Sequence, residues 1–264
     1  MLYDVNGNVI NPMEGMINVK DYGAVGDGTT DDTTAIQSAL DAVDTLGGGL
    51  VFFPTGSYII SSALLIKCSN IHIDFNGSTL IHDANETFNC MMRNYCEGGS
   101  GYTGIKNVIV ENGTFDGNGY TSSMTQLGFI HGSNIVTRNC RFIGTENTNT
   151  TWHHIEYNAV KYGIIENCYF EGNRGIAYEM IQLGDAYGSL GWPWDSPTWD
   201  DVGCDITEIK GCHFVDNGHA TCVGWHGTTA PTHINVHDCT AEDCATIVGV
   251  TAGVSHDNVS IATT

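Results

Sequence analysis

The chain is poor in positive charge. Its 264 residues include 9 Lys and Arg against 30 Asp and Glu, which gives a formal net charge of −21. Binding to nucleic acids depends on Lys and Arg that neutralise phosphates, and attraction to anionic membranes depends on the same residues. The composition therefore excludes nucleic acids and membrane surfaces as partners, and it disfavours a strongly polyanionic ligand.

Other features are also absent. No apolar run approaches the roughly 18 residues of a membrane span, and the first residues lack the basic and apolar regions of a signal peptide. Proline is scarce (5) and glycine abundant (33), which favours many short strands joined by tight turns. The ten cysteines include no CxxC pair, so we predict buried free thiols and no zinc site. A reducing or anaerobic setting suits such thiols.

A six-residue phrase recurs in the second half of the chain. TRNCRF at 137–142 returns as IENCYF at 165–170 and as IKGCHF at 209–214, and VHDCTA at 236–241 is a weaker copy. A repeat at this spacing indicates stacked supersecondary units. Equivalent positions predict a column of buried thiols at Cys140, Cys168, Cys212 and Cys239, and an interior stack of Phe115, Phe142, Phe170 and Phe214.

The pattern predicts a single all-β domain over residues 1–264. Residues 1–18 are a lead-in, residues 19–62 an N-terminal cap with a helix, and residues 63–264 a solenoid of about six coils. The chain ends within a strand-like segment that no polar cap follows. Because an open solenoid end is an aggregation liability, we expect a second subunit, as in a trimer, or a longer parent chain to cover it.

The start of the chain carries a specific motif. DYGAVGDGTTDDTTAI at 21–36, a helix, and then GGGLVFFPTGSY at 47–58 closely resemble the opening of the pectate-lyase-like superfamily, which includes polygalacturonases and phage tailspike depolymerases. The resemblance implies a right-handed parallel β-helix with an N-terminal capping α-helix. It also implies a polysaccharide as ligand, and a secreted, cell-surface or virion location.

Polar residues follow the repeated phrases at equivalent places, in segments 150–157, 177–185 and 218–227. A parallel β-helix would stack these segments about 4.8 Å apart. We therefore predict an exposed strip on one outer face, made of His153, His154, Glu156, Glu179, Gln182, Asp185, His219 and His226.

Glycoside hydrolysis usually needs one protonated carboxyl group and a second carboxylate. Glu179 is the predicted acid, because aromatic cover and neighbouring carboxylates would favour its protonated form. Glu156 or Asp185 is the predicted partner. The other residues of the strip are predicted to bind the sugar, and no cofactor is predicted.

The strip also resembles the active site of polygalacturonase-type hydrolases, which carry Asn-Thr-Asp, Asp-Asp and Gly-His-Gly segments on three successive coils. WHHIEY at 152–157 lies where the first segment would fall, YEMIQL at 178–183 where the second would, and Gly218-His219-Ala220 matches two residues of the third. The second segment keeps one carboxylate, Glu179, and the Arg-x-Lys segment of that family has no counterpart downstream. The family's mechanism and its galacturonate substrate are therefore not carried over intact.

Tryptophans surround the predicted strip. Trp152 and Trp225 flank it, and an insertion at 186–203, which accounts for the long spacing between Cys168 and Cys212, contains Trp192, Trp194 and Trp199. Indole rings offer a large apolar face with one hydrogen-bond donor, which suits stacking on sugars. We predict that this loop forms one wall of a substrate cleft; the alternative is a loop folded over a hydrophobic patch.

Three functions fit these features. The first is a glycoside hydrolase acting on a neutral or weakly acidic polysaccharide. The second is a polysaccharide lyase, which would use Lys161 or Arg174 as the base and would employ Ca²⁺. The third is a non-catalytic glycan binder, such as a phage-tail protein or a surface adhesin. The sequence ranks them in this order.

Overall fold

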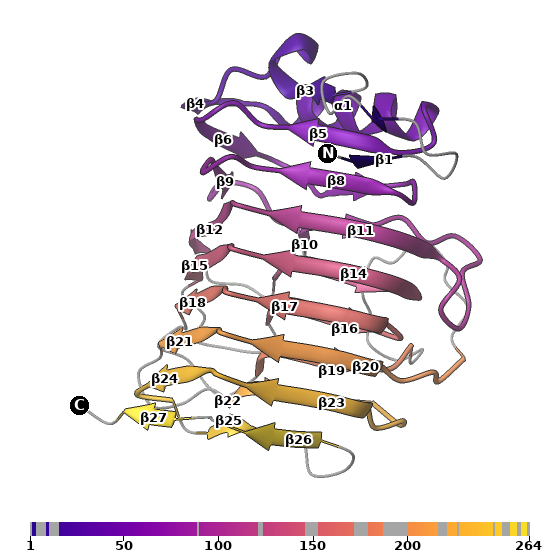
Figure 1. Cartoon of the computed structure of the whole chain (residues 1–264). Helices are drawn as coiled ribbons and strands as arrows, with labels where there is room; N and C mark the ends of the chain where they lie inside the picture. Colours follow the sequence, from indigo (N-terminus) through magenta and orange to yellow (C-terminus); the bar gives the residue numbers. More distant parts are fainter. Residues whose placement is uncertain are drawn as a thin grey trace.

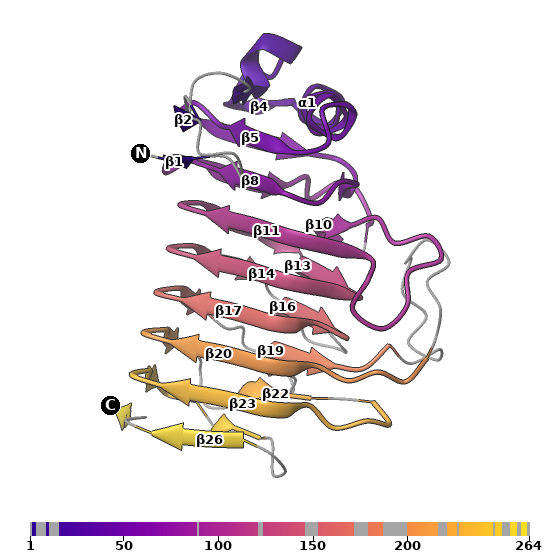
Figure 2. The same ribbon diagram turned by 45° about the vertical axis from the view of Figure 1, so that its right-hand side comes forward.

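The computed structural model describes residues 2–3, 9–10, 16–88, 90–120, 124–145, 153–171, 179–186, 200–215, 221–225, 227–244, 246–249, 254–257 and 260–262. These residues form a right-handed parallel β-helix (Figure 1). From β5 (Gly49–Phe52) onward a complete coil contributes one strand to each of three sheets, and the coils stack along a single axis (Figure 2).

We name the three sheets by number. Sheet 1 comprises β7 (Leu64–Ile66), β10 (Cys90–Asn94), β13 (Thr125–Ile130), β16 (His153–Asn158), β19 (Glu179–Gly184), β22 (Thr221–Gly224) and β25 (Thr246–Val248). Sheet 2 comprises β3 (Met16–Asn18), β5 (Gly49–Phe52), β8 (Ile71–Asp74), β11 (Ile105–Glu111), β14 (Gly132–Arg138), β17 (Lys161–Glu166), β20 (Asp205–Lys210), β23 (Thr232–His237) and β26 (Val254–Asp257).

Sheet 3 comprises β4 (Asp27–Asp31), β6 (Ser57–Ile60), β9 (Thr79–His82), β12 (Thr114–Tyr120), β15 (Arg141–Thr145), β18 (Tyr169–Glu171), β21 (His213–Val215), β24 (Thr240–Glu242) and β27 (Ser260–Ala262). A separate antiparallel pair, β1 (Leu2–Tyr3) and β2 (Val9–Ile10), precedes them. From residue 63 onward the described part of sheet 2 has seven strands, so the sequence estimate of about six coils was low.

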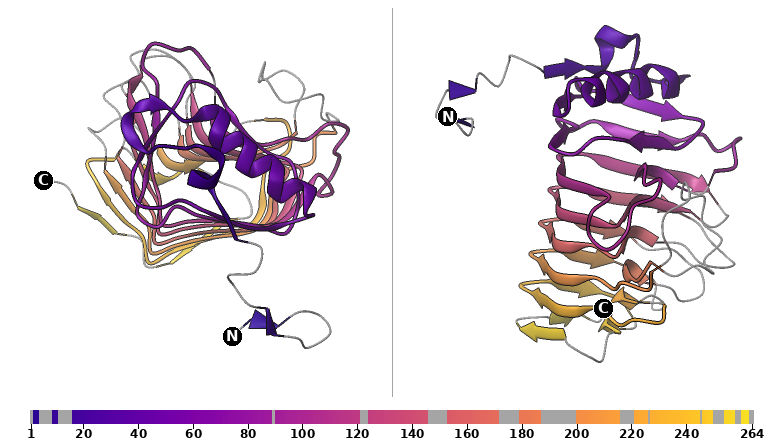
Figure 3. Two further views of the ribbon diagram at one scale, coloured as in Figure 1. Left: turned by 90° about the horizontal axis from the view of Figure 1, so that it is seen from above. Right: turned by 90° about the vertical axis from the view of Figure 1, so that its right-hand side faces the viewer.

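Helix α1 (Thr33–Thr45) lies across the N-terminal end of the coil (Figure 3), and a short 3-10 helix, η1 (Val19–Tyr22), precedes it. The apolar face of α1 is buried, as the spacing of Ile36, Leu40 and Val43 predicts. Asp32 stands at the N-cap position, but its carboxylate accepts the backbone N–H groups of Val25 and Gly26, at 2.6 and 3.0 Å. The Asp- and Gly-rich loop is therefore fastened to the helix and has a structural role.

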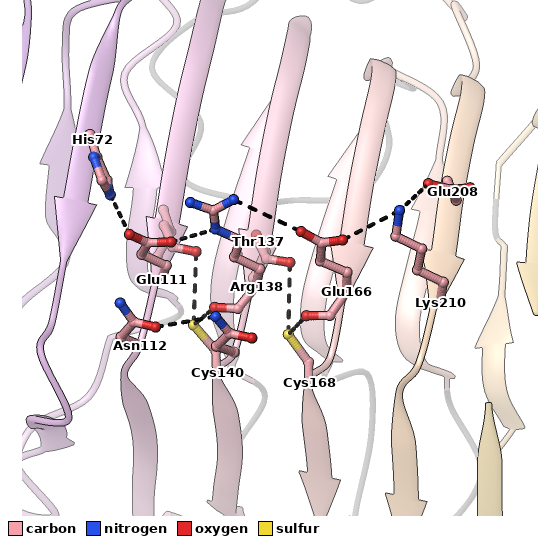
Figure 4. A network of polar contacts seen from close by, with 12 residues as sticks. His72, Glu111, Asn112, Thr137, Arg138, Cys140, Glu166, Cys168, Glu208 and Lys210 are labelled. Carbon is pink, nitrogen blue, oxygen red and sulfur yellow. Dashed lines mark hydrogen bonds and ion pairs between the residues drawn. The ribbon is translucent and has the colours of Figure 1, made fainter. Parts of the chain in front are cut away.

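The repeated phrase follows from the turn between sheets 2 and 3. Its Asn occupies a left-handed backbone conformation, with φ of 53° at both Asn139 and Asn167, which Asn tolerates better than most residues. The next residue, Cys140 or Cys168, is buried, and its thiol donates to the carbonyl two residues earlier (Figure 4). The predicted thiol column is confirmed, and all ten cysteines are buried and free.

The aromatic residue of the phrase forms the predicted interior stack. Phe142 lies 5.0 Å from Phe115 and 5.2 Å from Phe170 between ring centroids, and Phe170 lies 5.0 Å from Phe214. All four rings are fully buried. Strand register places them directly above one another, so each of these four coils adds one ring to the core.

The outer face of sheet 2 carries a row of alternating charges (Figure 4). Glu111 pairs with His72 and Arg138, Arg138 approaches Glu166 at 4.0 Å, and Lys210 bridges Glu166 at 3.3 Å to Glu208 at 2.8 Å. Opposite charges on neighbouring strands stabilise a sheet modestly. No helix in the described ranges is long and apolar enough to cross a membrane.

Candidate functional site

The strands of sheet 1 break the usual alternation of a β-strand. Consecutive residues such as Met180 and Ile181, or Cys222 and Val223, both lie in the hydrophobic core. A regular strand points successive side chains to opposite faces, so two inward neighbours require a local bend. The residues before and after each inward pair then lie on the outer face. It is this outer face of β13, β16, β19 and β22 that carries the candidate site.

Glu156 is held tightly on this face. Its exposed fraction is 0%, and its two carboxylate oxygens accept hydrogen bonds from Thr125 Oγ1 at 2.8 Å and from Asn158 Nδ2 at 2.7 Å. The prediction that Glu156 is exposed is wrong, because the bend folds neighbouring polar side chains over it. In this structure Glu156 acts as an acceptor that fixes its neighbours.

Glu179 is the most exposed of the three predicted carboxylates, since it is partly buried whereas Glu156 and Asp185 are fully buried. Its side chain lies over Gly224 of the next coil: a Cβ atom at Gly224 would be 2.1 Å from Glu179 Cγ. His153 Nδ1 donates to the backbone carbonyl of Glu179 at 2.7 Å. A buried His153 on β16 thus positions the start of β19, and Gly224 leaves the space that the Glu179 side chain occupies.

Asp185 fastens a turn. Its Oδ2 atom accepts hydrogen bonds from the backbone N–H and hydroxyl of Thr228, at 2.6 and 2.8 Å, and from the N–H of Thr229 at 2.5 Å. The expectation that Asp185 is exposed is therefore wrong. Its Oδ1 atom has no hydrogen-bond partner within the described part of the chain.

Gln182 and Asn158 converge over Gly184. A Cβ atom at Gly184 would lie 2.1 Å from Asn158 Oδ1 and 2.8 Å from Gln182 Nε2, and neither of these buried atoms has a hydrogen-bond partner among the residues that the structure describes. Gln182 is buried rather than exposed. An acceptor and a donor without partners are costly to bury, at about 1–3 kcal/mol each, so the pair is suited to a polar ligand group.

His154 faces the interior, not the outer face. Its ring lies 6.2 Å from that of Phe142 and 5.9 Å from that of Phe170, and its Nδ1 donates to Gln126 Oε1 at 2.5 Å. The prediction that it binds sugar is wrong, because the bend turns its position inward. His153 stays on the outer side of the strand, but it is buried and contacts a backbone carbonyl.

The other predicted residues are not part of this geometry. Trp225 is described and is partly buried directly after β22. The remaining ones lie outside the described residues: Trp152, Trp192, Trp194, Trp199, His219 and His226. The aromatic wall and the histidine contribution to the site therefore stay predictions.

Comparison with known proteins gives the family. Residues 16–263 match the family described as rhamnogalacturonase A/epimerase, pectate lyase-like. The chain belongs to this family. The match covers nearly the whole chain and confirms the superfamily that the opening motif predicted.

One curated relative of the chain is alginate lyase 7 from Azotobacter vinelandii. It is 54% identical over 63 residues, which are 21% of this chain and 7% of that protein. Two solved structures share the fold. The surface protein and adhesin PfbA of Streptococcus pneumoniae has a TM-score of 0.69 at 23% identity, over 86% of this chain and 61% of that one. An exopolygalacturonase from Thermotoga maritima has a TM-score of 0.64 at 15% identity, over 94% and 65%.

Two residues of the site, Asn158 and Thr125, were not predicted from the sequence. Asn158 follows Glu156 by two positions, so strand periodicity places it on the same face. Thr125 pairs in register with His153 on the next coil. The interval between them along the chain equals the interval between Cys140 and Cys168, so the repeat spacing marks Thr125 and His153 as equivalent positions. Arg93, the sole Lys or Arg within the strands of sheet 1, is buried on β10, outside the four strands that carry the candidate site.

The buried His154 makes stability sensitive to acid. Burial lowers the pKa of its imidazole from 6.5 to about 3, and a backbone hydrogen bond with Glu171 offsets this only in part. Between these values the unfolded chain binds a proton that the folded chain does not, so stability is lost as pH falls below 6.5. At pH 5 the loss relative to neutral pH is about 2 kcal/mol.

Chemical unfolding of the wild type and of His154→Gln at pH 7 and pH 5 measures this effect. The Gln amide can still donate to Gln126 but does not titrate, so the variant should lose about 2 kcal/mol less than the wild type between the two pH values. Equal losses in the two proteins would show that His154 is not the buried neutral group described here.

Proposed function

We propose that the protein is a glycoside hydrolase whose polysaccharide substrate lies on the outer face of sheet 1, with Glu179 as the proton donor. The observation that carries the proposal is the position of Glu179. Its carboxylate lies over Gly224 on the outer face, and the residue as a whole is partly exposed. The unpartnered Gln182 Nε2 atom lies on the same strand, β19, and the unpartnered Asn158 Oδ1 atom lies on β16 of the preceding coil. A carboxyl group in this position can act as the proton donor of sugar hydrolysis, which needs a second carboxylate as well.

In the proposed reaction Glu179 transfers its proton to the glycosidic oxygen as the bond to the anomeric carbon breaks. A water oxygen bonds to that carbon, and a carboxylate takes the proton of the water. Glu156 suits the second role better than Asp185. Its register partner on β19 is Gln182, three residues from Glu179, whereas Asp185 follows Glu179 by six residues along the strand, roughly 20 Å at about 3.3 Å per residue. The two carboxyl groups of a glycosidase lie roughly 5–9.5 Å apart.

A non-catalytic glycan binder is the second candidate. The observation that favours it is the burial of Glu156 and Asp185, which leaves Glu179 as the single predicted carboxylate at the surface. The solved adhesin PfbA shares the fold. A binder of this kind would act at a cell surface or on a virion, and an oligomer such as a trimer would multiply its contacts with the glycan.

A lyase has less support. Lys161, one of the two predicted bases, lies on β17 of sheet 2 and is paired with Asp205 at 2.9 Å, so it is on a different face from Glu179. Arg174 lies outside the described residues. Arg93 is the basic residue on sheet 1, and a guanidinium is a poor base because it stays protonated.

Incubation of the wild-type protein with neutral glycans, polygalacturonate and alginate separates the three functions. The hydrolase proposal predicts new reducing ends from a neutral or weakly acidic polysaccharide, without the ultraviolet absorbance of an unsaturated uronide. Calcium-dependent growth of that absorbance would replace the hydrolase by a lyase. Glycan retention in an affinity gel, without any product after long incubation, would establish the binder.

A further inference from the structure

A second, unrelated feature lies on the outer face of sheet 2, where its strands begin. One residue of each coil has a left-handed backbone here, in register from strand to strand. The first three are Asn70, Asn107 and Asn134, with φ of 59°, 56° and 55°. Their side-chain amides are linked, Asn107 to Asn70 at 2.7 Å and Asn134 to Asn107 at 3.0 Å. Asn suits this conformation, so these coils are unstrained.

In the next three coils this position is not occupied by asparagine. The same position holds Tyr162, Ile206 and His233, with φ of 59°, 53° and 52°. A β-branched residue such as Ile206 is a genuine outlier in this region, because its Cβ crowds the backbone. Packing does not explain the choice, since Tyr162 is 48% exposed and Ile206 41%. Strain of this kind is a reason to look for a function at the site.

The strained residues form the rim of a groove. Its volume is about 420 Å³, and its floor is made by the outward residues of β14, β17 and β20, namely Val136, Ile164 and Glu208. Asn134, Tyr162, Ile206 and His233 stand along the edge. The volume falls within the range of small-molecule sites, roughly 300–1,000 Å³. An exposed tyrosine, two apolar floor residues and hydrogen-bonding groups therefore surround one hollow.

Charge in the groove is balanced. Glu208 is paired with Lys210 at 2.8 Å and with His237 at 3.2 Å (Figure 4 shows the first pair). Asp205, next to Ile206, is paired with Lys161 at 2.9 Å and His233 at 2.7 Å. Because each carboxylate already has a lysine partner, neither a free anion nor a free cation is strongly attracted. The carboxylate oxygens remain suitable as hydrogen-bond acceptors.

We propose that this groove is a second carbohydrate site, which binds one or two uncharged sugar rings with the apolar ring face against Tyr162 and Ile206 and the hydroxyls toward Glu208 and His233. Sugars combine an apolar face with many hydroxyls, which is the chemistry of this hollow. A second copy of the chain is a poorer occupant. The net charge of −21 makes copies repel.

The test places asparagine at two of the positions where the later coils lack it, which continues the row of Asn70, Asn107 and Asn134. In the full-length Tyr162→Asn/Ile206→Asn double variant the rim is removed, while the backbone receives the residue that it favours. We expect its unfolding temperature to equal or exceed that of the wild type. In affinity gels that contain neutral polysaccharides (xylan, galactan or mannan), we expect at least a tenfold loss of affinity. Tyr22→Asn removes another exposed tyrosine, which is 39% exposed and lies in η1, and it should leave retention unchanged.

The inference shares with the proposed function only the class of ligand, and retention needs no turnover, so the two fail separately. Equal retention of the wild type and the double variant would overturn the groove site even if the protein cleaves glycans. Failure of every neutral polysaccharide to retain the wild type would also overturn it. So would sedimentation of the wild type as an oligomer and of the double variant as a monomer, which would make the groove a contact between copies.

Discussion

Glu179→Gln is expected to lower the rate of glycan cleavage by about 10²–10⁴-fold, the usual contribution of a positioned proton donor. The amide keeps the size of the carboxyl group, so the side chain still fits over Gly224, where a Cβ atom would meet it at 2.1 Å. Substrate affinity should change little, because the amide still forms hydrogen bonds. The measurement is kcat and KM on the polysaccharide that the wild type cleaves.

The matched control for this variant is Glu171→Gln. Glu171 lies on β18 of sheet 3, only a short distance earlier in the chain, and its side chain is exposed. The control removes the same charge from a different face, and its kcat should equal that of the wild type. If both variants cleave at the wild-type rate, Glu179 has no part in the chemistry. If both lose activity equally, the effect is one of net charge.

Phe170→Ala is expected to destabilise the fold by about 3–5 kcal/mol, the range for truncating a buried aromatic ring. Phe170 is fully buried, and it stacks on Phe142 at 5.2 Å and on Phe214 at 5.0 Å. Its loss opens a cavity between two coils. In a solenoid each coil is stabilised by its neighbours, so the damage should spread along the stack. Urea unfolding of wild type and variant measures the change.

Tyr169→Ala is the control, because it also removes an aromatic ring, from the neighbouring position on the same strand. Tyr169 is the neighbouring residue on β18, is only partly buried, and holds the Arg141 guanidinium 4.1 Å from its ring centroid. Its truncation should cost about 1 kcal/mol. A Phe170→Ala variant that is no less stable than Tyr169→Ala would contradict the account of the aromatic stack as the main support of the coil.

The coil itself was predictable because its signal is repeated. Each of the three closest copies of the phrase contains a turn residue, a buried thiol and a stacked ring, so three coils show the same arrangement. The single capping helix was predictable from apolar spacing and from the family motif. Asp32 shows where sequence rules for helix ends fail. A residue at the N-cap position usually bonds the first turn of its helix, but the Asp32 carboxylate accepts the backbone N–H groups of Val25 and Gly26 instead.

The site was predicted less well, for a physical reason. Repeat spacing tells which coil a residue belongs to, and alternation tells which face it occupies only if the strand is straight. The bend in sheet 1 places His154 inward and brings Thr125 over Glu156. Backbone dihedral angles are equally invisible in the sequence. Tyr162 and Ile206 read as ordinary strand residues, although their φ values are 59° and 53°.

The most direct measurement of the central claim is a crystal structure of Glu179→Gln soaked with an oligosaccharide of the glycan that the wild type cleaves. We predict a sugar on the outer face of β16, β19 and β22, with a glycosidic oxygen roughly 2.6–3.2 Å from the amide of residue 179. A sugar bound only on sheet 2 or sheet 3, with nothing near residue 179, would contradict the placement of the active site on sheet 1.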